Sequence, residues 1–212
     1  NEYNGECFCE LCLKAWQNWL EKKYKTIDNF NDAMWTNFWS HRYNNWSQVE
    51  PRDWVDGIRL DWLRFTTWQL CDFMKFEKDI LKSITPDIPA TTNMMGFFDK
   101  IDYWRVAELC DFIADDSYPS WHEPDDNTQT AASVAMKNDM LRSYKNGRPY
   151  IFMESCPSAT NWQKLHRLKR PGVHKLEMLQ AIAHGADGTM YFQWRKGKGG
   201  CERYHGAVVD HA

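Results

Sequence analysis

The chain has 212 residues, of which 43% are hydrophobic and 26% are charged, as in an ordinary globular protein. Its formal net charge of −3 gives no electrostatic reason to expect a nucleic acid or an anionic membrane as a partner. No apolar run approaches the ~18–20 residues of a membrane-spanning helix. The 12 tryptophans are unusual, and they indicate either an aromatic-rich core or flat platforms that stack on sugar rings.

Helix-like and strand-like patterns alternate along the chain. Apolar residues at helical spacing predict helices over 12–24, 57–83, 100–111, 128–146 and 174–184, with Thr26 capping a further short helix. Short apolar runs predict strands over 87–96, 112–119, 149–155 and 188–194. Such alternation implies parallel strands joined by helical crossovers, either in a doubly wound open sheet or in half of a (β/α)8 barrel. No glycine-rich phosphate loop follows a strand, which weakens the nucleotide-binding form of the open sheet.

Two carboxylates, Glu2 and Glu154, lie at the ends of strand-like segments. In a parallel barrel these ends meet at one face, where catalytic residues lie. Glycoside hydrolysis needs such a pair, because one carboxyl group protonates the departing oxygen while the other attacks the anomeric carbon or activates water. The alternative for Glu154 is a strand-end carboxylate that is satisfied by an arginine or by backbone N–H groups and has no catalytic role.

The seven cysteines are an odd number, which argues against a complete disulfide framework. Cys7, Cys9 and Cys12 form a C-x-C-x-x-C cluster, a thiol spacing that suits a tetrahedral structural zinc site better than disulfides. The free thiols also favour a cytoplasmic location. Three other cysteines lie in apolar patterns and are expected to be buried: Cys71, Cys110 and Cys156.

Seven segments carry a resemblance to a known family: NEY, CFCELC, TNFWS, NMMGFFDKIDYW, DSYP, FMESCPSATNWQ and FQWRKGKGGCERYHGAVVDH. In this order they resemble the glycoside hydrolase family 42 β-galactosidases over the whole chain. The resemblance implies that residues 1–212 are the C-terminal half of a (β/α)8 TIM barrel, from the end of strand 4 through strand 8, with a zinc loop at 5–13. The N-terminal half of the barrel and later domains would be absent from this sequence, and the chain alone is expected to be unstable, oligomerising or inactive.

The same resemblance implies roles for individual residues. Glu2 matches the general acid/base of the family, and Glu154 matches the nucleophile of a retaining double displacement. Glu202 and His205 match the galactose-binding group, where a carboxylate and an imidazole would bind the 4- and 6-hydroxyls; the alternative for His205 is a solvent-facing loop histidine. The expected substrate-binding residues are Asn1, Trp39, Tyr118, Trp162, Phe192, Glu202 and His205. Neighbouring aromatic side chains are expected to pack instead: Trp35, Phe38 and Trp46.

These observations predict a retaining β-galactosidase that cleaves terminal β-D-galactosyl residues from small oligosaccharides. The same site would also suit α-L-arabinopyranosides, which share the ring configuration of galactose without its C6 group. A non-catalytic, zinc-stabilised carbohydrate-binding or interaction module is the alternative from another class, since it needs the cysteines and tryptophans but neither glutamate. The resemblance further implies a structural zinc whose fourth ligand is a cysteine upstream of this chain, and a homotrimer of the full-length protein.

Overall fold

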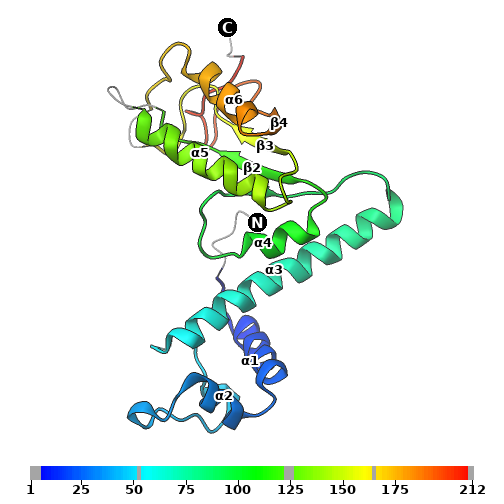
Figure 1. Ribbon diagram of the computed structural model, residues 1–212, viewed down its shortest axis with the longest axis vertical. Helices are drawn as coiled ribbons and strands as arrows, with labels where there is room; N and C mark the ends of the chain where they lie inside the picture. Colours follow the sequence, from blue (N-terminus) through cyan, green and yellow to red (C-terminus); the bar gives the residue numbers. More distant parts are fainter. Residues whose placement is uncertain (1–5, 52–53, 122–126, 164–165, 210–212) are drawn as a thin grey trace. The chain divides into compact units, whose positions relative to one another are not determined.

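The computed structural model describes residues 6–51, 54–121, 127–163 and 166–209 (Figure 1). The chain divides into two compact units, here called the helical unit and the sheet unit. The helical unit contains the chain up to Glu77 together with Asp99–Arg105, and the sheet unit contains Lys78–Phe98 and the chain from Val106 onward. Within the described residues no helix is both long enough and apolar enough to cross a membrane.

The helical unit is built around an aromatic core. Its elements are α1 (Glu10–Tyr24), α2 (Ile27–Met34), the 3-10 turns η1 (Phe38–Ser40) and η2 (Trp46–Gln48), and the first part of α3 (Asp56–Ile84). Side chains spaced three or four residues apart on these helices turn one face inward. The buried cluster consists of Trp16, Leu20, Phe30, Tyr43, Val49, Ile58, Trp62 and Phe65. The aromatic-core interpretation of the tryptophan content is therefore confirmed for Trp16 and Trp62.

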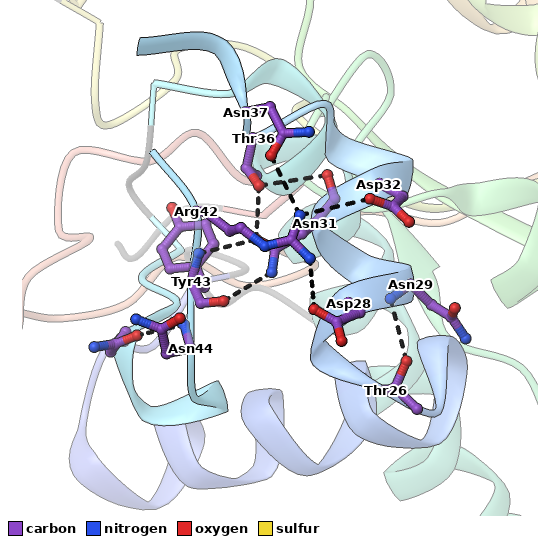
Figure 2. Close-up of polar contacts among 11 residues, drawn as sticks. Thr26, Asp28, Asn29, Asn31, Asp32, Thr36, Asn37, Arg42, Tyr43 and Asn44 are labelled. Carbon is purple, nitrogen blue, oxygen red and sulfur yellow. Dashed lines mark hydrogen bonds and ion pairs between the residues drawn. The ribbon is translucent and has the colours of Figure 1, made fainter. Parts of the chain in front are cut away.

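A buried asparagine joins α2 to the segment that follows it (Figure 2). Asn31 Nδ2 donates to the Tyr43 carbonyl at 2.7 Å, and Asn31 Oδ1 accepts from the Tyr43 N–H at 2.9 Å. The Thr36 hydroxyl donates to the same Oδ1 at 2.6 Å. Thr26 caps α2 as predicted, since its hydroxyl accepts from the Asn29 N–H at 3.1 Å. These bonds fix the turn between α2 and η2, because they satisfy buried polar groups that water cannot reach.

The sheet unit contains a parallel sheet in the order β1-β2-β3-β4. The strands are β1 (Asn93–Met94), β2 (Ile113–Ser117), β3 (Tyr150–Ser155) and β4 (Ala186–Thr189). The helices between them are α4 (Tyr103–Leu109), α5 (Thr128–Ser143) and α6 (Val173–Ala183). Figure 1 shows α5 and α6 running alongside the sheet, where α5 contacts β2 and α6 contacts β4. The predicted alternation of helices with parallel strands is therefore confirmed.

Two predicted strands differ from the observed ones. Only β1 forms within 87–96. The Ala90 N–H donates to the side chain of Asp111 at 2.7 Å instead of to a backbone carbonyl of a neighbouring strand. The last strand was predicted over 188–194 but β4 begins earlier, because Gly185 ends α6 at φ +97° and the strand starts directly after it. Phe192, expected on the last strand, lies beyond its end. Its N–H still donates to the Ser155 carbonyl at 3.1 Å, which keeps this segment beside β3.

Candidate active site

Glu154 lies near the carboxyl end of β3, beside the end of β2. The register pairs Asp115 with Phe152 but Asp116 with Glu154, so Met153 is an extra residue in β3. A bulge of this kind locally re-aims side chains and is common next to functional sites. It brings Glu154 level with the last residues of β2 and with the loop that follows them.

The nearest polar partner of Glu154 is a tyrosine. The Tyr118 hydroxyl donates to Glu154 Oε2 at 2.5 Å, and both side chains are partly buried. Burial, followed by the hydrogen bond to Glu154, raises the pKa of Tyr118 well above its usual value. The phenol therefore stays protonated and remains a donor over the physiological pH range. The hydrogen-bond donor to Glu154 is therefore a tyrosine and not the arginine or backbone N–H group of the alternative interpretation, and the catalytic role of Glu154 stays a prediction.

A further carboxylate at the same edge was missed by the sequence reasoning. Asp116 pairs with Glu154 across the two strands, and its Oδ2 accepts a hydrogen bond from the side-chain amide of Asn93 on β1. Its neighbour Asp115 is fully buried and contacts Lys137 Nζ of α5 at 2.9 Å. Successive residues of a strand face opposite sides of the sheet, so only one of two adjacent aspartates lies on the Glu154 side. The sequence "DD" at a strand end was the available signal.

Four aromatic rings gather next to Glu154. The His205 ring centroid lies 5.4 Å from that of Tyr118, 5.3 Å from that of Trp162 and 5.0 Å from that of Phe192. Tyr118 and Trp162 are themselves in edge contact at 4.8 Å. The fold thus brings together four of the residues predicted to bind substrate.

His205 is fully buried, so the alternative of a solvent-facing loop histidine is wrong. Burial lowers the pKa of His205, an effect that the backbone of Phe192 partly opposes. A neutral imidazole has one donor and one acceptor nitrogen. Glu202 is partly buried on the same loop, and its carbonyl accepts from the His205 N–H at 3.0 Å.

The loops that carry Trp162 and His205 are tied together. Asn161 Nδ2 donates to the Cys201 carbonyl at 2.9 Å, and its Oδ1 accepts from the Tyr204 N–H at 3.1 Å. The Gly206 N–H donates to the Ala159 carbonyl at 2.7 Å. A β-carbon at Gly206 would lie 2.8 Å from the Ala159 nitrogen, closer than real contacts allow. Glycine is therefore needed where the two loops meet.

Three predicted site residues are not among the described residues of the sheet unit. Asn1 and Glu2 lie outside the described residues, and with them the separation between Glu2 and Glu154. Trp39 belongs to the helical unit, is 85% exposed and stacks on Phe38. Phe38 is itself largely exposed, as is Trp35, so the expectation that these two pack inward is wrong. Three residues between 35 and 40 have left-handed backbone angles, which turn these rings outward: Trp35, Trp39 and Ser40.

The cysteine cluster of the helical unit converges as a metal site would require. The sulfur atoms of Cys7, Cys9 and Cys12 all lie within 4.8 Å of one another, just before and within the first turn of α1. Hydrogen bonds from the Cys12 backbone and from neighbouring thiols lower the pKa of Cys9, whereas burial raises the pKa of Cys12 to about 12. Thiolate sulfur is the preferred ligand of structural zinc. Three converging sulfurs therefore fit three positions of a tetrahedral site.

The other cysteines are also free thiols, so none of the seven forms a disulfide. Cys110 and Cys156 are buried as expected, but Cys71 is partly exposed on α3, which corrects that expectation. Cys201 is exposed on the loop before His205.

Comparisons with known proteins agree over the full chain. Residues 1–212 match the model of glycoside hydrolase family 42, described as beta-galactosidase. The beta-galactosidase BglY of Alicyclobacillus acidocaldarius is 50% identical and Pbg of Clostridium perfringens is 45% identical; the matches cover 100% of this chain but 31% and 32% of those proteins. The chain therefore spans about a third of the length of these curated relatives.

Solved structures give the same result. The cold-adapted beta-galactosidase from Rahnella sp. R3 superposes with a TM-score of 0.95 at 50% identity, over 100% of this chain and 32% of that one. Gan42B, a GH42 beta-galactosidase from G. stearothermophilus, gives 0.94 at 45% identity, over 100% and 33%. A structure of Gan42B described as a catalytic mutant, with a glutamate changed to alanine, matches equally well. The chain belongs to glycoside hydrolase family 42.

Proposed function

We propose that this chain is part of a retaining β-galactosidase in which Glu154 is the nucleophile. The observation that carries the proposal is the Tyr118–Glu154 hydrogen bond at the carboxyl edge of a parallel sheet, where chemistry in barrels of parallel strands is found. The names of the family and of the relatives support the activity, and the glutamate changed in the Gan42B mutant supports a catalytic glutamate.

The reaction proceeds by double displacement. Glu154 attacks the anomeric carbon while Glu2, protonated at this stage, gives its proton to the departing glycosidic oxygen. A covalent galactosyl ester forms on Glu154, and its carboxylate charge is lost. Glu2 then takes a proton from the water that hydrolyses the ester. Retention requires the two carboxyl groups to be about 5–5.5 Å apart, which is the expected separation here.

Tyr118 orients the nucleophile before the attack. Its hydroxyl stabilises the charged carboxylate through Oε2 and leaves the other oxygen for the anomeric carbon. When the ester forms, this donor faces a weaker acceptor, so the hydrogen bond favours departure of Glu154 in the second step. The group that contacts the nucleophile thus acts in both halves of the reaction.

Galactose is recognised at the aromatic cluster. Trp162 is 56% exposed, which leaves a ring surface on which the apolar side of a sugar can stack. The neutral His205 and the nearby Glu202 supply polar atoms for the 4- and 6-hydroxyls, while Phe192 packs against the His205 ring. Asn1 is assigned to the 2-hydroxyl, and Trp39 to a position that lines the site.

The domain assignment follows from the sheet. The order β1-β2-β3-β4, with each strand next to its predecessor, supports the interpretation that residues 1–212 are the C-terminal half of a (β/α)8 barrel. Cys7, Cys9 and Cys12 would hold a structural zinc that fastens the loop at 5–13, with a fourth cysteine from the rest of the barrel. The free thiols support a reducing, cytoplasmic location, and a homotrimer is the assembly assigned to the full-length protein.

The decisive experiment replaces the nucleophile. Because the chain spans about a third of its relatives, the test uses a full-length protein that carries it. Glu154→Ala should lower turnover of an aryl β-galactoside on the order of 10⁴-fold. Azide should restore turnover and give the α-galactosyl azide, because it attacks from the face that the carboxylate has vacated.

The matched control is Glu21→Ala, which removes an exposed glutamate of α1 and should leave turnover unchanged. Turnover near the wild-type value in Glu154→Ala, or an azide product of retained configuration, would contradict the assignment of the nucleophile.

A further inference from the structure

A buried ion pair lies next to the turn that follows β3. Lys169 Nζ is 2.5 Å from Glu177 Oε2 of α6, and the two side chains are 3% and 0% exposed. Removing two charges from water is costly, and an apolar pair of similar volume often gives equal or greater stability. The mechanism proposed above uses neither residue. An ion pair in such a place therefore requires another explanation.

The second partner of Lys169 supplies that explanation. Its Nζ also donates to the carbonyl of Cys156, two residues after Glu154. The Cys156 thiol donates to the Ala159 carbonyl at 2.8 Å, which closes the turn that follows the nucleophile. Lys169 therefore holds this turn in place through the Cys156 carbonyl. Glu177, which belongs to α6, in turn fixes the position of the Lys169 ammonium group.

The surroundings leave the lysine little freedom. Burial raises the pKa of Glu177, and the charge of Lys169 acts against this rise. Burial lowers the pKa of His174 and of His205, and the positive charge of Lys169 lowers both further. The charge of Lys169 therefore acts both on a histidine of α6 and on the histidine of the aromatic cluster.

We propose that Lys169, anchored by Glu177, is a positioning residue that fixes the Cys156 turn and thereby the direction of the Glu154 carboxylate during its attack on the anomeric carbon. This inference rests on the proposed function. A 1 Å displacement of a catalytic group lowers the rate without weakening the binding of substrate, because binding uses other contacts. Loss of the tie should therefore lower kcat and leave KM nearly unchanged.

The test separates positioning from stability. Lys169→Met alone leaves Glu177 buried without a cation, so it should lower the melting temperature as well as the activity. The double variant Lys169→Met/Glu177→Leu replaces the ion pair with an apolar pair and should melt close to the wild-type temperature. Both variants lose the hydrogen bond to Cys156. The control is Lys175→Met, which removes an exposed lysine of α6.

The most direct readout is the labelling rate of Glu154 in the full-length protein. A 2-deoxy-2-fluoro-β-galactoside with a good leaving group reacts as the bond from Glu154 Oε to C1 forms and the bond from C1 to the leaving group breaks. Its leaving group needs no proton, so the rate reports attack alone. The double variant should label and turn over about 10- to 100-fold more slowly, with KM within about threefold of wild type.

A double variant that melts, labels and turns over like the wild type would overturn the inference. If the apolar pair does not fold, Lys169→Gln/Glu177→Gln replaces it with a neutral pair whose glutamine at 169 is one bond shorter than lysine and cannot keep both contacts. The same slow labelling is expected, and an unchanged rate would again overturn the inference. A wild-type protein with neither galactosidase activity nor labelling would instead remove the proposed function.

Discussion

The Tyr118 hydroxyl and Glu154 Oε2 are 2.5 Å apart, although the two residues are 36 positions apart in the sequence. Tyr118→Phe removes this donor and keeps the ring that contacts Trp162 and His205. A hydrogen bond to a charged group contributes about 1.5–3 kcal/mol, so kcat should fall by about 10- to 100-fold. Steady-state kinetics of the full-length protein measure this loss.

The matched control is Tyr150→Phe, which removes a phenol whose hydroxyl donates to the Ala181 carbonyl at 3.3 Å. This variant should keep the wild-type kcat. If Tyr118→Phe also keeps it, the hydrogen bond has no part in catalysis.

His205→Phe tests recognition of the sugar. Phenylalanine suits the buried aromatic surroundings, so the melting temperature should stay near the wild-type value. Loss of the ring nitrogens should lower kcat/KM for a β-galactoside by about tenfold, equivalent to ~1.4 kcal/mol. An α-L-arabinopyranoside, which has no C6 group, should lose less. Equal losses for the two substrates would exclude a contact between His205 and the 6-hydroxyl.

The cysteine cluster predicts a metal that stabilises the protein without taking part in the reaction. A chelator should lower the melting temperature by several degrees, because metal binding contributes directly to folding free energy. Cys9→Ser should have the same effect, whereas Cys201→Ser, a change at an exposed thiol of the sheet unit, should not. Elemental analysis that finds no zinc in the purified full-length protein would contradict the prediction.

The carboxylate of Asp111 should contribute to stability in a way that is lost at low pH. Its carboxylate contacts Lys78 at 2.6 Å, the Ala90 N–H at 2.7 Å and Lys82 at 2.9 Å, and these contacts, with Lys78 first, lower its pKa strongly. A lowered folded pKa gives stability that is present above the unfolded value of about 4 and is lost as the pH falls below it. Asp111→Asn should therefore destabilise the protein by ~1–2 kcal/mol at pH 7, a figure reduced for partial exposure, and by less at pH 3.

Urea unfolding at the two pH values measures this difference. Asp87→Asn is the control, because it changes an exposed aspartate in the same region. A destabilisation by Asp111→Asn that is equal at both pH values would show that the charge of Asp111 is not the cause.

Replacing the buried Asn31 should lower the free energy of unfolding of the helical unit substantially (Figure 2). Asn31→Ala leaves two backbone groups of Tyr43 buried without their partner, and it leaves the Thr36 hydroxyl only its 3.4 Å contact with the Asn31 carbonyl. A buried polar group without a hydrogen-bond partner costs about 1–3 kcal/mol. The free energy of unfolding should therefore fall by ~2–4 kcal/mol after local relaxation. Chemical denaturation measures it, with the exposed Asn29→Ala as control. A loss below ~1 kcal/mol would mean that water replaces the side chain.

Most helices could be predicted because their signals are local. The apolar spacing in 12–24 and 57–83 agrees with α1 and α3 to within two residues, and Thr26 marked the start of α2. The strands β2 and β3 each begin with a short apolar run and end in polar residues, a local pattern that predicts a strand. The position of β4 depends on how Gly185 ends α6, and that conformation is not visible in the pattern of apolar residues.

The site was predictable only where a residue type and a strand end coincide. Glu154 satisfies that condition, but its bond to Tyr118 depends on the extra residue in β3, which alters the register without any sequence signal. Lys169 lies in the basic sequence HRLKRPG, which is typical of a solvated surface, so only the fold reveals its burial. Trp35 and Phe38 were misjudged for the opposite reason, since left-handed backbone angles at Trp35 and next to Phe38 accompany apolar rings that are exposed.

The close approach of Gly206 to Ala159 limits how the sequences and lengths of these two loops can change during evolution. Ala159 and Gly206 meet so closely that the two loops must move, lengthen or shorten together. An insertion in one loop would separate Trp162 from His205 unless the other loop changed as well. Relatives with altered sugar preference should therefore differ here by exchange of side chains at constant loop length, and directed evolution of this chain should sample point substitutions before insertions.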